Sequence, residues 1–314
     1  MVQIARLGCV SAGAAGVAVW LNGRSRRPAE PVPLAVRPHF QVPSNAAFPQ
    51  MVVVQGGDPA ELARRAIDEL GGIHRFISPG DVVAIKPNAA WDRTPEQAAN
   101  TNPQLVAEVG RLCLYAGARR VIVTDVSIND AQRCFARSGI AAAVERAGAG
   151  VILPTASLLR EVDLRGRVLN VWPVLDPFLT ADKLINIPIA KHHSLTGATL
   201  GMKNWYGILG GPRQQLHQRI HESIVDLADF MRPTLTLLDA FRVLVRNGPG
   251  GGNPSDVELK KTLIAGTDPV AVDAYAAKAY WNLDWRTLPY LKLAAERGLG
   301  RFDLESAATR FVTL

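Results

Sequence analysis

The chain has 314 residues, of which 48% are apolar and 20% charged, so it can bury one large core or two small ones and is not disordered throughout. Of its formal net charge of +7, five arginines and one glutamate place +4 in the first 49 residues and leave +3 for the rest. A body with so balanced a charge lacks the basic stripe that nucleic-acid phosphates require, and we predict no nucleic-acid partner.

Residues 7–21 are an uncharged, Ala- and Gly-rich run between Arg6 and Arg24. The run is too short for an ordinary membrane span and matches the apolar region of an export signal. We interpret residues 1–27 as an export signal or membrane tether, which predicts a periplasmic or membrane-tethered protein. If the segment is not a signal, a cytoplasmic location follows.

Residues 28–49 contain six prolines and few periodic apolar positions. This composition predicts an extended, proline-rich linker. We expect the folded domain to cover residues 50–314, with its first strand near Met51.

The rest of the chain alternates short β-branched runs with segments of helical period, which is typical of a parallel sheet. We expect strands at residues 51–55, 81–86, 119–125, 150–153, 183–188, 234–239 and 261–266. The expected helices cover residues 59–70, 103–116, 130–147, 215–230, 270–280 and 287–297. Residues 160–173 alternate apolar and polar side chains about Arg165 and Gly166, as a β-hairpin does. The predicted fold class is α/β, a mostly parallel sheet with helices on both faces and an appended hairpin.

Three cysteines are present, Cys9, Cys113 and Cys134, and they are widely separated. Structural zinc sites and iron–sulfur clusters usually take four ligands, often in closely spaced pairs. We therefore expect no all-cysteine iron–sulfur cluster in this chain. The cofactor stays unknown, and a divalent metal held by nitrogen and oxygen ligands stays open.

Polar side chains follow several of the predicted strands. In open parallel sheets the ligand lies beyond the carboxyl ends of the strands, where loops and helix N-termini converge. This rule selects Asp268, for which a helix N-cap is an equal alternative, and further side chains that close a strand or lie just past one, namely Lys86, Asn88, Asp125, Lys191, His192, His193 and Asp239. We expect them to line one crevice.

Six motifs occur in order along the body, at residues 85–88, 101–106, 123–125, 185–209, 216–227 and 265–274. Together they resemble the domain-of-unknown-function 362 (DUF362) family over roughly residues 50–300. Many members carry ferredoxin-like cysteine motifs, which this chain lacks, so a redox role would need an external electron carrier. The domain is also distantly similar to the strand-rich half of lactate-racemase-type proteins, which implies the handling of small carboxylates.

The densest polar group runs from Lys191 to Asn204 and holds two lysines, two histidines, three hydroxyls and an amide. Such donors hold a phosphate or carboxylate, and a histidine exchanges protons near neutral pH. We predict His192, His193 and Lys203 as catalytic residues, and Lys191 and Asn204 as substrate ligands. A surface loop is the alternative interpretation.

Lys86 ends a strand before Pro87, which holds the chain extended so that the lysine projects beyond the sheet edge. We predict that Lys86 clamps an anion with Asn88 beside it; a solvated loop lysine is the alternative. Asp125 and Asp239 each end an apolar strand, and we expect them to contact substrate, to orient a lysine or histidine, or to bind a divalent ion.

His217 and His221 lie four residues apart, on one face of the expected helix, and this is also a metal-ligand spacing. Gln218 replaces the glutamate that a zinc protease carries after its first histidine. We expect one histidine in the crevice and the other in solvent. The family motif includes His221, which makes it the substrate-binding candidate; a pair of metal ligands is the alternative.

Two further segments have simple interpretations. Asp268 before Pro269 is typical of a helix N-cap followed by proline at the first helical position. The glycine-rich residues 247–253 do not match a phosphate loop, and we interpret them as a mobile lid over the crevice.

These residues predict an enzyme that acts on a small anionic substrate, a carboxylate or phosphate, through lysine and histidine anion binding and acid–base chemistry. Two alternatives stay open. One is a non-catalytic binder of an anion or metal. The other is an accessory redox protein without an iron–sulfur cluster of its own.

Overall fold

The computed structural model describes residues 39–304 and 308–314. The predicted export or tether segment and the first part of the predicted linker lie outside the described residues. Residues 39–49 form no helix or strand, and Phe40 among them is buried against the core. No helix in the described ranges has the length and apolar character needed to cross a bilayer.

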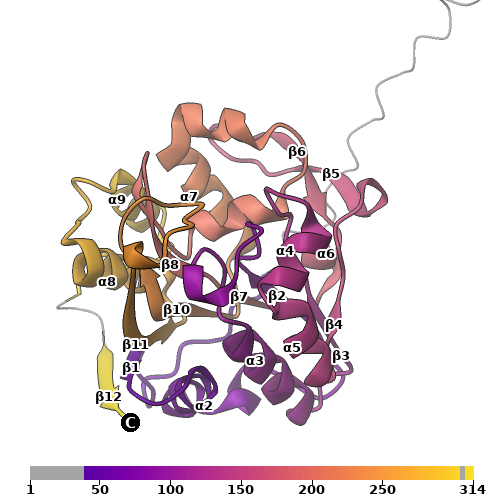
Figure 1. Ribbon diagram of the computed structural model, residues 1–314, viewed down its shortest axis with the longest axis vertical. Coiled ribbons are helices and arrows are strands. Elements are labelled where there is room, and N and C mark those ends of the chain that lie inside the picture. Colours follow the sequence, from indigo (N-terminus) through magenta and orange to yellow (C-terminus); the bar gives the residue numbers. More distant parts are fainter. Residues whose placement is uncertain (1–38, 305–307) are drawn as a thin grey trace, which may run out of the picture. The chain divides into compact units, whose positions relative to one another are not determined.

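Ten strands of the described residues form one sheet (Figure 1). The strand order is β12-β1-β11-β10-β7-β2-β3-β4, and β8 pairs with β10 and β9. The strands are β1 (Met51–Gln55), β2 (Val82–Pro87), β3 (Arg120–Val123), β4 (Gly150–Val151), β7 (Lys183–Ile187), β8 (Ile189–His193), β9 (Gly197–Thr199), β10 (Leu235–Leu244), β11 (Val257–Gly266) and β12 (Thr309–Thr313). The run from β10 through β7, β2 and β3 to β4 is parallel, and β11 is antiparallel to both neighbours. The predicted mostly parallel sheet is confirmed.

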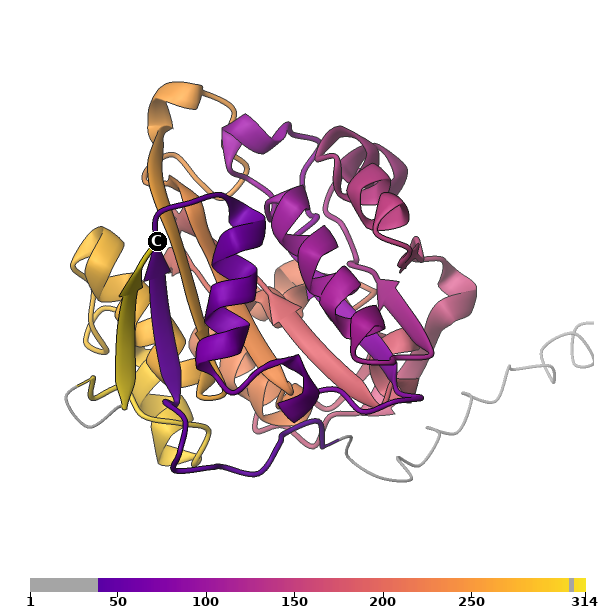
Figure 2. The same ribbon diagram turned by 90° about the horizontal axis from the view of Figure 1, so that it is seen from below.

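Helices cover both faces of this sheet, as predicted (Figure 1, Figure 2). One face carries α2 (Pro59–Glu69), α3 (Pro103–Tyr115), α4 (Ala131–Arg137) and α5 (Ile140–Arg146); the other carries α7 (Ile220–Met231), α8 (Pro269–Trp281) and α9 (Pro289–Glu296). Strand β1 shows why two cores form, because successive side chains point to opposite faces. Val52 and Val54 join the core of α2 and α3, whereas Met51 and Val53 join the opposite core.

The predicted hairpin is a separate antiparallel pair, β5 (Leu159–Asp163) and β6 (Val171–Leu175), followed by the short helix α6 (Pro177–Thr180). Asp226 of α7 holds its turn by accepting hydrogen bonds from the backbone N–H groups of residues 167–169. A Cβ atom at Gly166 would lie only 2.4 Å from Asp226 Oδ2, so the turn requires glycine there.

Three expected elements differ from the structure. The helix predicted at residues 130–147 is two helices, because Gly139 between them has a φ of 75°. The helix predicted from residue 215 starts at Ile220, after the 3₁₀ helix η5 (Arg213–Arg219). The residues from Lys191 to His193, expected just past the strand at residues 183–188, belong to a second strand, β8, which starts directly after Pro188.

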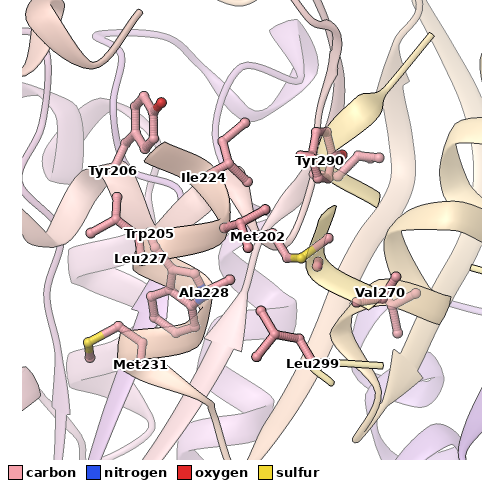
Figure 3. Packing of buried hydrophobic residues seen from close by; sticks show 14 of the residues in the cluster. Met202, Trp205, Tyr206, Ile224, Leu227, Ala228, Met231, Val270, Tyr290 and Leu299 are labelled. Atoms are coloured by element: carbon pink, nitrogen blue, oxygen red, sulfur yellow. The ribbon is translucent and has the colours of Figure 1, made fainter. Parts of the chain in front are cut away.

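The core behind the functional site packs around Trp205, which is fully buried (Figure 3). Trp205 lies in the 3₁₀ helix η4 (Lys203–Ile208) and shares a hydrophobic cluster with Met202 and with Leu227 of α7. Close packing of such large side chains leaves few alternative positions for the backbone between them. Lys203, between Met202 and Trp205, is therefore held in place.

Candidate functional site

A cavity of about 490 Å³ lies past the carboxyl ends of β2 and β3, beside β8 and η4. Seven of the ten predicted site residues line it: Lys86, Asn88, Asp125, Lys191, His193, Lys203 and Asn204. The parallel strands bring these residues together because their carboxyl ends meet at one edge of the sheet.

Lys86 is buried at the end of β2 and makes three short polar contacts. Its Nζ lies 2.7 Å from Asp125 Oδ1, 2.9 Å from the Pro87 carbonyl oxygen and 3.0 Å from Asn204 Oδ1. Asp125 Oδ2 in turn accepts a hydrogen bond from Ala89 N at 2.7 Å. An ammonium group has three hydrogens. Lys86 thus donates two hydrogen bonds and forms an ion pair with Asp125, so its charge is matched within the protein.

Lys191 on β8 has one hydrogen to spare. Its Nζ donates to Asn88 Oδ1 at 2.9 Å and to the Ala99 carbonyl oxygen at 2.6 Å, and no carboxylate among the described residues pairs with it. Burial, and then the charge of Lys203, lower the pKa of Lys191 well below its ordinary value. A bound anion would supply the charge and the acceptor that Lys191 lacks.

Lys203 is buried and has no hydrogen bond or ion pair within the described part of the chain. Its Nζ lies 4.9 Å from the centre of the Tyr206 ring, a cation–π contact. Burial lowers the pKa of Lys203 to about 8. All three hydrogens of this ammonium group therefore remain for a ligand.

Thr199 adds a second free polar group. It is 5% exposed, lines the cavity and lies opposite Lys191 in the antiparallel β8–β9 register. Its Oγ1 has no hydrogen-bond partner within residues 39–304 and 308–314. Buried hydroxyls are ordinarily paired, so this one is a candidate ligand contact.

His193 and His217 line the cavity with their rings stacked, 6.0 Å between centres and 11° between planes. His193 Nδ1 accepts hydrogen bonds from Leu195 N (3.1 Å) and Thr196 N (3.3 Å), which assigns the proton of the neutral ring to Nε2. Burial and then the charge of Lys203 lower the pKa of His193 to about 3. His193 is therefore neutral at pH 7 and suited to donating a hydrogen bond from Nε2.

Arg213 completes a cationic lining. Its guanidinium donates to the carbonyl oxygens of Val126 (2.7 Å), Ser127 (2.8 Å) and Tyr206 (3.2 Å). The described lining has four cationic side chains, three lysines and this arginine, against the single carboxylate of Asp125. With neutral histidines, four minus one leaves a formal charge of +3. Such a charge favours an anionic ligand.

Two predicted site residues lie away from this cavity because of strand geometry. Side chains alternate along β8, so His192 faces away from Lys191 and His193, and its Nδ1 accepts from Gly248 N at 3.2 Å. Asp239 on β10 accepts from Asn102 N (2.7 Å) and holds the start of α3; burial raises its pKa to about 6.

His221 also lies away from the cavity, where its ring stacks on Tyr290 at 6.2 Å. The expectation that His217 and His221 share one helix face is wrong. The backbone changes from 3₁₀ to α-helix at Arg219, with φ −132° and ψ 61°, so the regular four-residue spacing does not cross this point. His217 is the histidine that reaches the cavity.

Several cavity residues with polar or aromatic side chains were not among the predicted site residues, including Trp91, Thr199, Tyr206, Arg213 and His217, although one of His217 and His221 was expected in the crevice. Thr199, Tyr206 and Arg213 lie within or next to the donor-rich segment that ends at Asn204, so extending that segment by about ten residues would have included them. Trp91 carries no comparable signal.

The glycine-rich residues 247–253, interpreted above as a lid, do approach the cavity, since Pro249 lines it.

The turn before η4 is anchored by Asp273 of α8, a buried carboxylate. It accepts hydrogen bonds from Gly201 N (2.7 Å) and Met202 N (3.0 Å), and burial raises its pKa to about 7. Asp268 caps α8 as predicted, accepting from Val270 N and Ala271 N. Asp273 therefore positions the segment that carries Lys203.

Gly207→Ala is expected to disrupt the cavity floor. A Cβ atom there would lie 2.0 Å from Asp125 Oδ1 and 2.6 Å from Lys86 Nζ, so the buried ion pair would have to move. We expect the free energy of unfolding to fall by about 2–4 kcal/mol, measured by urea denaturation. Gly150→Ala is the matched control, because its Cβ would meet only the Val121 carbonyl oxygen at 3.7 Å. Equal effects of the two substitutions would contradict this account.

Potential metal ligands do not cluster in the described part of the chain, where no group of three or more His, Cys, Asp or Glu side chains could hold an ion. Cys113 and Cys134 are free and buried, and burial raises the pKa of the Cys113 thiol to about 12. Cys9 lies outside the described residues.

The fold and cavity define an α/β protein with a cation-rich pocket at the strand ends. The family model for the domain of unknown function DUF362 matches residues 83–278, and the chain belongs to this family. It is 27% identical over 252 residues to "Thylakoid-associated protein sll1697" of Synechocystis sp., covering 76% of this chain and 74% of that protein. The lactate racemase apoprotein of Thermoanaerobacterium thermosaccharolyticum has 13% identity and a TM-score of 0.43, over 72% of this chain and 56% of that one.

Proposed function

We propose that the protein is an enzyme that binds a small carboxylate or phosphate in the cavity and exchanges protons with it. The observation that carries this proposal is that the cavity holds buried cationic side chains without carboxylate partners and buried donor groups without acceptors. Lys191 and Lys203 are buried without a carboxylate partner in the described chain, and Thr199 Oγ1 has no partner there either. Buried cations without counter-charge are costly, and an anion would supply what they lack.

The donors suggest a division of roles. Lys191, Lys203 and Thr199 contact the anion. Lys86, which is held by Asp125, supplies positive charge to the cavity without contacting the anion. His193 donates from Nε2 to the bound substrate. Lys203, with a pKa of about 8, exchanges a proton near neutral pH.

We propose that residues 1–27 hold the protein outside the cytoplasm or against a membrane. The support is the apolar run with flanking arginines, together with the thylakoid association stated in the name of the Synechocystis relative.

Sulfate, whose charge is constant between pH 6 and 9, tests the anion site by titration calorimetry. We expect Lys191→Met to weaken sulfate binding by about 10- to 100-fold, because a charge-assisted hydrogen bond is lost. Binding to the unchanged protein is also expected to weaken as the pH rises through about 8, where Lys203 loses its proton. Lys278→Met, at an exposed position of α8, is the control and should bind normally. Equal affinity in both variants would refute the anion site, and binding without turnover of any small carboxylate or phosphate would refute catalysis.

A further inference from the structure

The three lysines of the cavity are not equivalent as nucleophiles. Lys86 Nζ is surrounded by three oxygens within 3.0 Å, and Lys191 Nζ donates to two. Lys86 would have to give up its ion pair with Asp125 before its lone pair could react, whereas Lys191 is tethered by its two acceptors, which fixes its amine as an anion ligand. Lys203 Nζ is free of such contacts and faces the cavity beside the Tyr206 ring.

The surroundings of Lys203 favour its neutral form. The side chain is buried, burial lowers its pKa, and no carboxylate in the described residues pairs with it. A pKa of about 8 leaves roughly one amine in ten unprotonated at pH 7. Desolvation is a condition under which a lysine amine attacks carbonyl groups.

We propose that Lys203 forms an imine with the carbonyl carbon of a small 2-oxo carboxylate, whose carboxylate group is held by Lys191 and Thr199. This inference rests on the proposed anion site and names the substrate class for it. Lys191 and Thr199 are cross-strand partners on β8 and β9 and both line the cavity, so the spare hydrogen of Lys191 and the unpaired Thr199 hydroxyl are two donors available to one carboxylate.

The chemistry balances without an oxidant or reductant. The amine lone pair forms a C–N bond to the carbonyl carbon, and the carbonyl oxygen takes a proton to give a carbinolamine. In this step the nitrogen gives up its extra proton. The hydroxyl then takes a second proton, the C–O bond breaks and water leaves, and loss of the iminium N–H proton gives the imine, so two protons have passed from nitrogen to oxygen. His217, which lines the cavity with its Nδ1 3.3 Å from the Gln214 carbonyl oxygen, is placed to carry these protons.

Reductive trapping tests this inference on the full chain. The protein is incubated with pyruvate and sodium cyanoborohydride, then analysed by intact mass and peptide mapping. We expect one reduced adduct per chain, on Lys203, forming faster as the pH rises from 6 to 8. The lysines outside the cavity provide an internal control: Lys183, Lys260, Lys261, Lys278 and Lys292.

Three variants and one competitor give the test its specificity. Lys203→Arg should lose the adduct while keeping the charge, Lys191→Met should slow its formation, and Lys278→Arg should leave it unchanged. Sulfate should slow trapping in the unchanged protein, a result that does not depend on any variant folding correctly. An adduct spread over surface lysines, or one that persists in Lys203→Arg, would overturn the inference.

The outcomes separate this inference from the proposed function. If sulfate binds with the predicted dependence on Lys191 but pyruvate yields no adduct, imine formation is wrong and the anion site stands. If neither sulfate binding nor an adduct is found, both the proposed anion site and imine formation are wrong.

Discussion

Lys86→Met is expected to lower the free energy of unfolding by about 3 kcal/mol. The substitution removes one partner of an ion pair in which both side chains are 1% exposed, with Nζ and Oδ1 2.7 Å apart. The Asp125 carboxylate would then remain buried without its nearest counter-charge, and Asn204 Oδ1 would lose a donor. Arg213 still faces Asp125, which places the expected effect at the lower end of the range for breaking buried ion pairs.

Urea denaturation at pH 7 measures this effect, and a double substitution provides the control. In the Lys86→Met, Asp125→Asn variant no buried charge of the pair remains, so we expect part of the lost stability to return. A Lys86→Met variant as stable as the unchanged protein would show that the pair does not hold the cavity together.

Lys203→Met is expected to have the opposite effect and to raise the free energy of unfolding at pH 7 by up to about 3 kcal/mol. Lys203 is buried with no hydrogen bond or ion pair in the described chain, so methionine removes an uncompensated charge and leaves no partner unsatisfied. If the cavity binds an anion as proposed, this gain in stability would accompany weaker anion binding, a trade-off common at functional sites.

The pH dependence of stability isolates this effect. The pKa of Lys203 in the folded protein, about 8, lies below its ordinary value of 10.5. Between these values the unfolded chain binds more protons than the folded protein, so the contribution of Lys203 to stability rises with pH across that window. The difference between Lys203→Met and the unchanged protein should therefore be largest below pH 8 and shrink toward pH 10.5. A difference that does not vary with pH would contradict this explanation.

These opposite signs distinguish two buried lysines of one cavity. Burial lowers the pKa of both lysines, but removing Lys86 leaves the buried Asp125 carboxylate without its nearest counter-charge, whereas removing Lys203 leaves no partner in the described residues unpaired. In the sequence both are lysines beside apolar segments. They differ only in the partners that the folded protein gives them.

Much of the site could be predicted from the sequence because the rule behind it is local. Apolar runs such as residues 81–86 end at polar residues, and parallel strands bring those ends together. Lys86, Asp125 and Lys191 were found in this way.

The errors arose where a residue's position depends on neighbours distant in sequence. His192 was grouped with His193, but strand β8, which starts directly after Pro188, turns their side chains to opposite faces. Asp239 ends an apolar run, yet it binds the backbone of Asn102, 137 residues earlier in the chain. Neither relation has a signature in the local pattern.

The sequence by itself determined the α/β alternation, the two-sided helical cover, the hairpin and the family, because periodicity and motif order are properties of the chain. The tertiary structure decided which donors remain free. Thr199 faces Lys191 only through the β8–β9 register, and His217 rather than His221 reaches the cavity because the helix begins at Ile220. Hydrogen-bond and ion-pair partners come from segments far apart in sequence, so only the folded protein shows that Lys86 is paired with Asp125 and that Lys203 has no such partner in the described residues.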